Sequence, residues 1–267
     1  MLLAVDIGNT NIVVALFHNT EIVQEWRIHS DSDRTSDEYA SILRSLFRDT
    51  GVTAGSINTS ILSSVVPLLY GPFISLLESI TGTKPFIVGP AMYSKLPITI
   101  PESAIHEIGT DLVCNAVEAW SLYHQPIIIT DFGTALTFTV IDAKGQIQGV
   151  AIAPGIKTAI NSLFNNTAQL PSVALEAPET SLGTNTIYSI QAGIILGYKG
   201  LVESLVSRMK SDLAKQTNCS EIDIKVIATG GLNSVLKPIT ACIDDVDKSL
   251  TLKGLYRIAC ILYNKKL

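Results

Sequence analysis

The sequence predicts an α/β protein built from two related halves that face each other across a cleft. Apolar runs typical of buried strands alternate with segments of helical periodicity along the chain, a pattern that indicates a partly parallel sheet. One short motif, an apolar strand ending in Asp and followed by a turn with Gly, occurs twice. The two carboxylates, Asp6 and Asp131, lie about half of the 267 residues apart. We therefore expect domains over residues 1–120 and 121–267.

The first motif offers groups that suit a phosphate and a cation. Asp6 ends an apolar run and is followed by Gly8, Asn9 and Thr10, whose N–H groups and hydroxyl suit a phosphate, while the carboxylate suits a hydrated cation. The alternative is an ordinary hairpin turn in which Asp and Asn satisfy local backbone groups. The repeat of the motif, together with a strand that ends in Gly230-Gly231, favours a nucleotide cleft with two phosphate turns and a glycine floor.

The first half alternates strands and helices in a regular order. Tyr39, Ile42, Leu43, Leu46 and Phe47 recur at helical spacing after a plausible N-cap at Thr35 or Ser36, so this segment predicts a covering helix. The expected strands span residues 2–6, 13–17, 21–28, 60–64 and 84–88, and the expected helices span residues 36–48 and 68–79. Residues 96–108 contain two prolines and little periodicity, which predicts a loop.

An alanine-rich helix is predicted at residues 109–120, and it begins with an ambiguous carboxylate. Asp111 follows Gly109 and Thr110 at the start of this helix. An Asp at such a position is most often a cap or a first-turn charge that the helix dipole favours. The alternative is a carboxylate held in the cleft as a general base or to orient a substrate hydroxyl.

The second half repeats the layout of the first. Strands are expected at residues 127–131, 137–141, 146–155 and 225–229, and helices at residues 156–166, 186–209 and 252–264. Residues 170–181 are rich in Pro, Glu and Ser and predict a loop. Small residues such as Gly193 and Gly197 lie inside the long helix at 186–209, which predicts close packing, with a second copy of the chain as one candidate partner.

Composition excludes several classes of protein. A net charge of −5 gives no electrostatic footprint for nucleic acid. No apolar run reaches the roughly 18–20 residues of a membrane span. The four cysteines form no C-x-x-C pair and the four histidines are dispersed, so we expect free thiols in a reducing cytoplasm. Neither a G-x-x-x-x-G-K-[ST] nor a G-x-G-x-x-G motif is present, so the phosphate site belongs to another design.

Taken together, these motifs resemble the sugar-kinase, chaperone and actin superfamily, and within it the type III pantothenate kinase family. The matching segments stand in family order along the whole chain: Asp6 to Asn11, Ser63 to Pro67, Asp131 to Ala135, Pro154-Gly155, Ala168 to Pro171, Gly183-x-Asn-Thr186 and Gly230-Gly231. The resemblance implies duplicated ribonuclease-H-like domains, each a mixed sheet of the five-stranded type flanked by helices.

The resemblance also implies an activity: phosphorylation of pantothenate by ATP, the first step of coenzyme A synthesis. It implies Asp111 as the catalytic base, Asp6 near Mg²⁺, and Asp131 as the ligand of a monovalent cation, K⁺ or NH₄⁺. A homodimer is expected, with the pantothenate pocket completed at the subunit interface. The implied ATP-binding residues are Asp6, Ile7, Gly8, Asn9, Thr10, Asn11, Ile12, Val13 and Thr134, and the implied pantothenate-binding residues are Gly109, Thr110, Asp111 and Thr186.

The sequence departs from the family pattern before the alanine-rich helix. Glu102 stands in place of a Tyr, Ala104 and Ile105 in place of Asn-Pro, and Leu112 in place of an Arg that could pair with the pantothenate carboxylate. Two alternatives therefore stay open beside pantothenate kinase. One is a kinase of the same fold for another small alcohol, and the other is a nucleotide-binding regulatory protein without catalysis.

Overall fold

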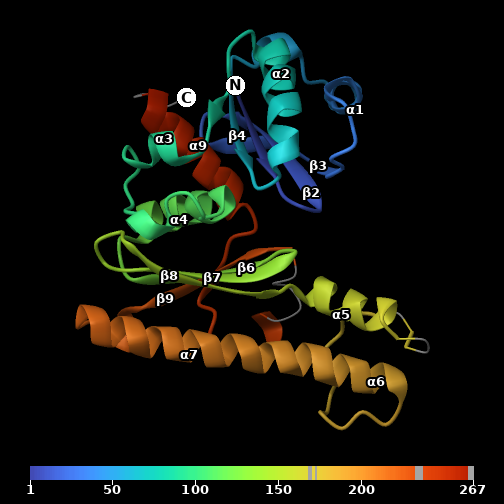
Figure 1. The fold of residues 1–267 in the computed structure, drawn as a ribbon, viewed down its shortest axis with the longest axis vertical. Coiled ribbons are helices and arrows are strands. Elements are labelled where there is room, and N and C mark those ends of the chain that lie inside the picture. Colours follow the sequence, from blue (N-terminus) through green and yellow to red (C-terminus); the bar gives the residue numbers. More distant parts are fainter. Residues whose placement is uncertain (168–169, 172, 232–236, 264–267) are drawn as a thin grey trace. The chain divides into compact units, whose positions relative to one another are not determined.

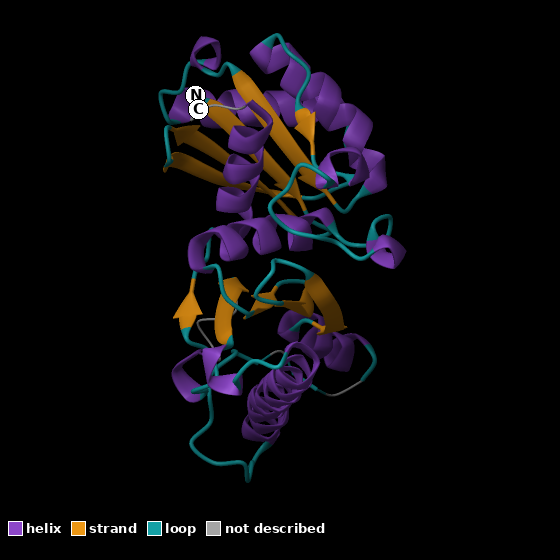
Figure 2. Cartoon of the chain, turned by 90° about the vertical axis from the view of Figure 1, so that its left-hand side faces the viewer, coloured by secondary structure: helices purple, strands orange, loops and turns teal. Residues whose placement is uncertain are grey.

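The computed structural model describes residues 1–167, 170–171, 173–231 and 237–263. The chain forms two compact units: Met1–Ser121 together with the chain from Leu250 onward, and Leu122–Ser249. Each unit contains a five-stranded mixed sheet with helices packed on it (Figures 1 and 2). The expected duplicated α/β fold is confirmed. The C-terminal helix, which a division after residue 120 assigns to the second half, belongs to the first unit.

The first sheet is organised around its N-terminal strand. The strand order is β3 (Glu21–His29), β2 (Asn11–His18), β1 (Leu2–Ile7), β4 (Thr59–Ser64) and β5 (Phe86–Ile87). β1 pairs antiparallel with β2 and parallel with β4. Because β1 is central, its side chains are buried on both faces, which explains why the sequence there reads as a continuous apolar run.

Helices cover both faces of this sheet. α1 (Ser36–Asp49) and α2 (Tyr70–Thr81) pack against the face that carries Leu3, Val5 and Ile7. The N-cap of α1 is Thr35, one of the two candidates from the sequence, and it forms a capping box: the Thr35 side chain accepts from the Glu38 amide and the Glu38 carboxylate accepts from the Thr35 amide. α9 (Leu250–Tyr263) covers the opposite face, where Tyr256 stacks on Phe17 with ring centroids 4.9 Å apart.

Helix α4 (Thr110–Tyr123) is fastened to α9. Arg257 forms a two-pronged ion pair with the buried Glu118, with Nη2 donating to Oε1 over 3.0 Å. The Thr251 hydroxyl donates to the Asn115 side chain over 2.8 Å. At Gly254 the two helices cross so closely that a Cβ would overlap the backbone carbonyl of Cys114. These contacts hold α4 in a defined position on the first unit.

The second sheet repeats the strand order and pairing of the first. Its order is β8 (Ile147–Pro154), β7 (Ala135–Ile141), β6 (Ile127–Phe132), β9 (Lys225–Gly230) and β10 (Asp245–Val246). β6 pairs antiparallel with β7 and parallel with β9, as β1 does with β2 and β4. β6 is therefore the counterpart of β1.

The long helix of the second unit differs from the sequence prediction. It consists of α6 (Thr186–Gln191), a π-helical segment (Ala192–Leu196) and α7 (Gly197–Thr217), so it is interrupted once and ends later than residue 209. α7 runs across one face of the sheet (Figure 1). Tyr198, Val202 and Val206 of α7 share a buried cluster with Ile128 and Phe138 of the sheet. α5 (Ile156–Asn165) precedes these helices in the chain.

Other differences are local. The strand expected at residues 84–88 is only two residues long, and the short helix α3 (Pro90–Tyr93) and strand β10 were not predicted. The loop expected at residues 96–108 is irregular apart from one 3₁₀ turn at Glu102–Ala104. Ala168 and Gln169 of the family-order segments, and the end of the last helix at Asn264, lie outside the described residues. In the part of the chain that the structure describes, no helix is long and apolar enough to cross a bilayer.

The crossing of α4 and α9 at Gly254 yields a stability prediction. Gly254→Ala should lower the free energy of unfolding by about 2 kcal/mol, because the new methyl group would push against the backbone of α4. Gly71→Ala in α2 of the same unit is the matched control, since a Cβ at Gly71 meets nothing within 4 Å and alanine favours a helix by up to about 1 kcal/mol. Urea denaturation should show opposite shifts for the two variants, and equal shifts would contradict the close crossing.

Candidate active site

Asp6 lies near the end of the central strand of the first unit, beside the turn that joins β1 to β2. The pairing aligns Asp6 with Val13 on β2 and with Ser63 on β4. Ser63 donates a hydrogen bond to Asp6 Oδ1 over 2.9 Å. In the turn itself, the Gly8 amide donates to the Asn11 carbonyl over 3.0 Å, and the Asn9 and Thr10 side chains are exposed. The turn is a hairpin that also presents polar groups to solvent next to a carboxylate.

The residues predicted to bind ATP at this turn divide into two groups. Gly8, Asn9 and Thr10 form the turn and can face a ligand. Ile7 and Ile12, however, have fully buried side chains that belong to the apolar core. Their contribution to a ligand site is restricted to the backbone, and their side chains hold the two strands of the hairpin in place.

Asp111 lies in the first turn of α4, in the same unit as Asp6. Its Oδ1 accepts a hydrogen bond from the Leu112 amide over 2.8 Å. Burial raises the pKa of the Asp111 carboxyl above its ordinary value, and the hydrogen bonds from backbone amides oppose that shift only in part. A Cβ on Gly109 would overlap the Asp111 carboxylate, so the residue before Thr110 must be small for the carboxylate to keep its position.

Thr110 connects the start of α4 to the sheet. Its side chain is buried, its hydroxyl lies 2.9 Å from the Ser63 hydroxyl, and it donates to the Ser64 carbonyl over 3.1 Å. Burial raises the pKa of the Cys114 thiol, and the charges of Asp6 and Asp111 raise it further. The charges of both carboxylates thus act on one buried thiol of α4. Asp6, Ser63, Thr110 and Asp111 therefore form one polar region of the first unit.

The second unit has a corresponding carboxylate at Asp131. The pairing aligns Asp131 with Thr137 on β7 and with Thr229 on β9, so the three side chains share one face of the sheet. Among the described residues, the buried hydroxyls of Thr137 and Thr229 have no hydrogen-bond partner. Buried polar groups are rarely left unpaired. Two such hydroxyls on either side of a carboxylate therefore indicate a site for a ligand that oxygen atoms can coordinate, such as a cation.

Thr134 lies in the turn that follows Asp131. Its carbonyl accepts from the Gly155 amide over 2.9 Å and from the Thr158 hydroxyl over 2.7 Å, while its side chain is exposed. The start of α5 therefore holds the backbone of this turn, and the Thr134 hydroxyl can reach a ligand. Gly230, the first residue of the predicted glycine floor, has a φ of 85°.

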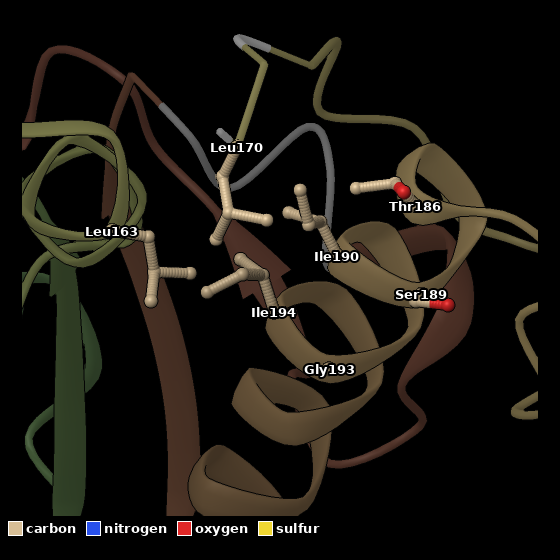
Figure 3. Close-up of a pocket in the computed structure, with 7 residues that line it drawn as sticks. All are labelled: Leu163, Leu170, Thr186, Ser189, Ile190, Gly193 and Ile194. Atoms are coloured by element: carbon tan, nitrogen blue, oxygen red, sulfur yellow. The ribbon is translucent and has the colours of Figure 1, made fainter. Parts of the chain in front are cut away.

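Thr186 lies elsewhere in the second unit, at the start of α6. It lines an open, largely apolar pocket of about 450 Å³. Figure 3 shows that Leu163 and Leu170 face Ile190 and Ile194 across this pocket. Asn185 caps the helix by accepting from the Tyr188 amide over 3.0 Å. Thr186 belongs to the second unit, whereas Gly109, Thr110 and Asp111, with which the sequence analysis grouped it, belong to the first.

Sequence reasoning missed Ser63, Thr137 and Thr229 as site residues. Ser63 stands in a strand that ends in a small polar pair, and Thr229 directly precedes Gly230-Gly231. Those positions carried a weak signal, but only the strand register places their hydroxyls beside Asp6 and Asp131.

Comparisons with known proteins agree on one family. A family model described as "Type III pantothenate kinase" matches residues 2–208. Proteins with the same name from Geotalea uraniireducens (strain Rf4) and Syntrophotalea carbinolica are 40% and 42% identical over 255 residues, and each alignment covers 96% of both chains. A third, from Moorella thermoacetica, is 41% identical and is covered to 97%.

Solved structures show the same fold. A Campylobacter jejuni protein described as a Baf family transcriptional activator has a TM-score of 0.59 at 15% identity, covering 98% of this chain and 99% of that one. A Sinorhizobium meliloti protein described as a 2-dehydro-3-deoxygalactonokinase has a TM-score of 0.54 at 9% identity, with coverages of 98% and 97%. At such identities the likeness concerns the fold alone.

The left-handed backbone at Gly230 generates a prediction for the second carboxylate. A Cβ at this position would lie 2.7 Å from Asp131 Oδ1 and from the Phe132 backbone. Gly230→Ala should therefore lower the free energy of unfolding by at least about 1–2 kcal/mol and displace the Asp131 carboxylate. The adjacent Gly231→Ala is the control, because Gly231 is exposed and its Cβ would meet nothing within 4 Å. Urea denaturation and a crystal structure of each variant would check both effects, and a Gly230→Ala variant as stable as Gly231→Ala would refute the argument.

Proposed function

The chain belongs to the type III pantothenate kinase family, and we propose that Asp6, Asp111 and Asp131 carry the reaction of that family in this chain. The enzyme is a kinase that phosphorylates pantothenate in coenzyme A biosynthesis. The observation that carries our assignment of residues is the polar region of the first unit. There, the Thr110 hydroxyl is linked through Ser63 to Asp6, and Asp111, a half-buried carboxyl whose pKa burial raises, directly follows Thr110 in the chain.

Asp6 and the turn after it would bind the phosphates of ATP. Phosphoryl transfer depends mainly on positioning and on neutralising charge, and Mg²⁺ bound with ATP supplies much of that neutralisation. Mg²⁺ is usually held by one or two carboxylates together with phosphate oxygens, and Asp6 beside the exposed Gly8 to Thr10 turn fits that donor set. Backbone amides of residues 6–13 and the side chains of the exposed turn would surround the phosphates, and the exposed Thr134 hydroxyl would add one contact.

Asp111 would act as the general base. The primary hydroxyl of pantothenate would attack the γ-phosphorus of ATP, its proton would pass to Asp111, and the bond from the γ-phosphorus to the bridging oxygen would break to leave ADP. Since Asp111 Oδ1 is held by the Leu112 amide, the second carboxylate oxygen is the one expected to receive the proton. The raised pKa of Asp111 makes it a stronger base than an exposed carboxylate.

Gly109, Thr110 and Thr186 would contribute to the pantothenate site in different ways. The Thr110 hydroxyl is already engaged with Ser63 and Ser64, so Gly109 and Thr110 would bind through backbone N–H groups at the start of α4. Thr186 would act through its side chain at the rim of the apolar pocket. Leu112 is only 7% exposed, so this position supplies packing within the first unit where the family pattern has an Arg.

Asp131 would hold a monovalent cation such as K⁺ or NH₄⁺. The structure offers a carboxylate flanked by two buried hydroxyls that have no hydrogen-bond partner among the described residues, and this set of one charged and two neutral oxygen donors fits a singly charged ion. We infer that Thr137 and Thr229 contribute those neutral donors. The cation would place a positive charge near Thr134 and near the phosphate group that the Thr134 hydroxyl contacts.

A homodimer is proposed from the exposed apolar surface near α6. Leu182, Ile187 and Tyr188 are 77%, 49% and 53% exposed, and a Cβ on Gly193 or Gly197 would meet nothing within 4 Å. The small residues of the long helix therefore do not serve close packing within the described chain, which supports packing against a second copy.

We place the enzyme in the cytoplasm, because all four of its thiols are free.

A coupled assay of ADP release tests the assignment. Wild-type enzyme with Mg-ATP, K⁺ and pantothenate should turn over, and Asp111→Asn should lose at least about 100-fold in kcat, because the base that takes the hydroxyl proton is removed. Binding of ATP to Asp111→Asn, measured by calorimetry, should be unchanged. Absence of turnover on pantothenate by folded wild-type enzyme would exclude this substrate, and full activity of Asp111→Asn would exclude Asp111 as the base.

The same variant should also report the pKa of Asp111 through stability. Because burial raises this pKa above the ordinary value of 3.8, the native state holds the proton to higher pH than the unfolded state, and stability falls as pH rises through that interval. Asp111→Asn removes this cost, so without ligands it should unfold at a higher temperature than wild type at pH 7–8. The difference should vanish as the pH falls below the ordinary value.

Thr229→Val tests the cation site with a readout apart from activity. Without K⁺ the variant should be at least as stable as wild type, because valine replaces a buried hydroxyl that has no partner. Added K⁺ should raise the Tm of wild type more than that of the variant, and the K⁺ concentration for half-maximal activity should rise about tenfold. Thr130→Val, also buried on the same sheet but on its other face, is the control. Equal K⁺ responses of Thr229→Val and wild type would remove Thr229 from the site.

A further inference from the structure

The Ser63 hydroxyl links two functional segments of the first unit. Its oxygen lies 2.9 Å from Asp6 Oδ1 at the end of β1 and 2.9 Å from the Thr110 hydroxyl at the start of α4. Ser63 is completely buried and Thr110 is 8% exposed. Water therefore has little access to compete for these bonds, and the link is a fixed part of the site.

The protons of the Ser63 and Thr110 hydroxyls limit which hydrogen bonds can form around Asp6. Each hydroxyl has one proton to donate, and an ionised carboxylate only accepts. Because Ser63 donates to Asp6, it can only accept from Thr110, and the one Thr110 proton is shared between the Ser63 hydroxyl and the Ser64 carbonyl. Removing the Ser63 hydroxyl therefore removes its contacts with both Asp6 and Thr110, and leaves the bond from Thr110 to the Ser64 carbonyl.

The duplicated fold contains an internal comparison. Thr229 occupies the position beside Asp131 that Ser63 occupies beside Asp6, as the parallel registers of β9 with β6 and β4 with β1 show. Among the described residues the Thr229 hydroxyl has no partner. A hydroxyl at this position is therefore not bonded merely because of the sheet, and the contact between Ser63 and Thr110 exists because the start of α4 reaches β4.

We propose that Ser63 is a positioning residue of the kinase, which holds Asp6 and the first turn of α4 at a constant separation. The proposal rests on the proposed function, in which Asp6 lies near the ATP phosphates and Asp111, next to Thr110, accepts the proton of the substrate hydroxyl. Attack on the γ-phosphorus requires the two reactants to stay aligned, and a shift of about 1 Å costs roughly 100-fold in rate. Through Ser63, the position of α4, which carries Asp111, is tied to the position of Asp6.

The test compares Ser63→Ala with Ser60→Ala. Both serines are buried on β4, but the Ser60 hydroxyl has no hydrogen-bond partner among the described residues, so its loss breaks no link. In the ADP-release assay Ser63→Ala should lose about 10–100-fold in kcat while the KM for pantothenate changes less than about threefold. Ser60→Ala should resemble wild type. Equal kcat values for the two variants, or equal losses in both, would overturn the proposal.

A double variant separates positioning from general destabilisation. Thr110→Val removes the other hydroxyl of the link while it keeps the branched side chain. If Ser63 acts through Thr110, the double variant Ser63→Ala/Thr110→Val should fall no more than about threefold below the slower single variant. Multiplied losses would show that the two residues act independently and would contradict the proposal.

Hydrogen exchange distinguishes failure of this inference from failure of the proposed function. In Ser63→Ala, amides of residues 110–115 should exchange at least about fivefold faster than in wild type and in Ser60→Ala, because the start of α4 keeps only the bond from Thr110 to the Ser64 carbonyl and loses its contact with Ser63. If wild type does not phosphorylate pantothenate, the function fails, and the exchange result still decides whether Ser63 holds α4. Unchanged exchange in Ser63→Ala would overturn the inference even if the enzyme is active.

Discussion

The parallel pairing of β1 with β4 is the constraint on which the site of the first unit depends. A carboxylate at the end of a buried central strand is costly unless its oxygens are hydrogen-bonded. The register of this pairing supplies the Ser63 hydroxyl at the required place, 2.9 Å from Asp6. The Thr110 hydroxyl contacts Ser63 over 2.9 Å and donates to the Ser64 carbonyl of the same strand. The start of α4, and with it Asp111, is thereby located relative to the strand.

The opposite side of α4 is held by contacts with α9. Glu118 is 4% exposed and pairs with Arg257 of the C-terminal helix, and Gly254 lets the two helices touch. The last helix of the chain thus completes the first unit, although the whole of the second unit precedes it in the sequence. A helix fixed at both faces can keep the Asp111 carboxylate partly buried with a raised pKa, which a mobile loop could not do.

Duplication gave the two units the same sheet but different chemistry at equivalent positions. Asp6 and Asp131 occupy matching places on β1 and β6, and each has a hydroxyl residue on the neighbouring parallel strand. In the first unit that hydroxyl is consumed by an internal network, whereas in the second Thr137 and Thr229 keep theirs without partners among the described residues. The hydroxyl beside Asp6 thus joins protein groups, whereas the hydroxyls beside Asp131 are the ones that we propose as cation ligands.

The sequence by itself determined the α/β class, the duplication, the strand–Asp–Gly turns and the family, because each depends on local pattern. Apolar runs, turn residues and the order of short motifs are all readable without knowing which strands are neighbours. Asp111 could not be separated from an ordinary helix cap, since both roles use the same residue at the same place. Its burial and raised pKa, which favour the catalytic role, come from packing.

Only the tertiary structure decided which distant residues meet. The register of β4 and β9 brings Ser63 and Thr229 beside their carboxylates, and α9 joins the first unit rather than the second. The π-helical segment at Ala192–Leu196 likewise has no clear sequence signal. These features follow from contacts between segments far apart in the chain, and such contacts are selected by burial and hydrogen bonding in the folded protein.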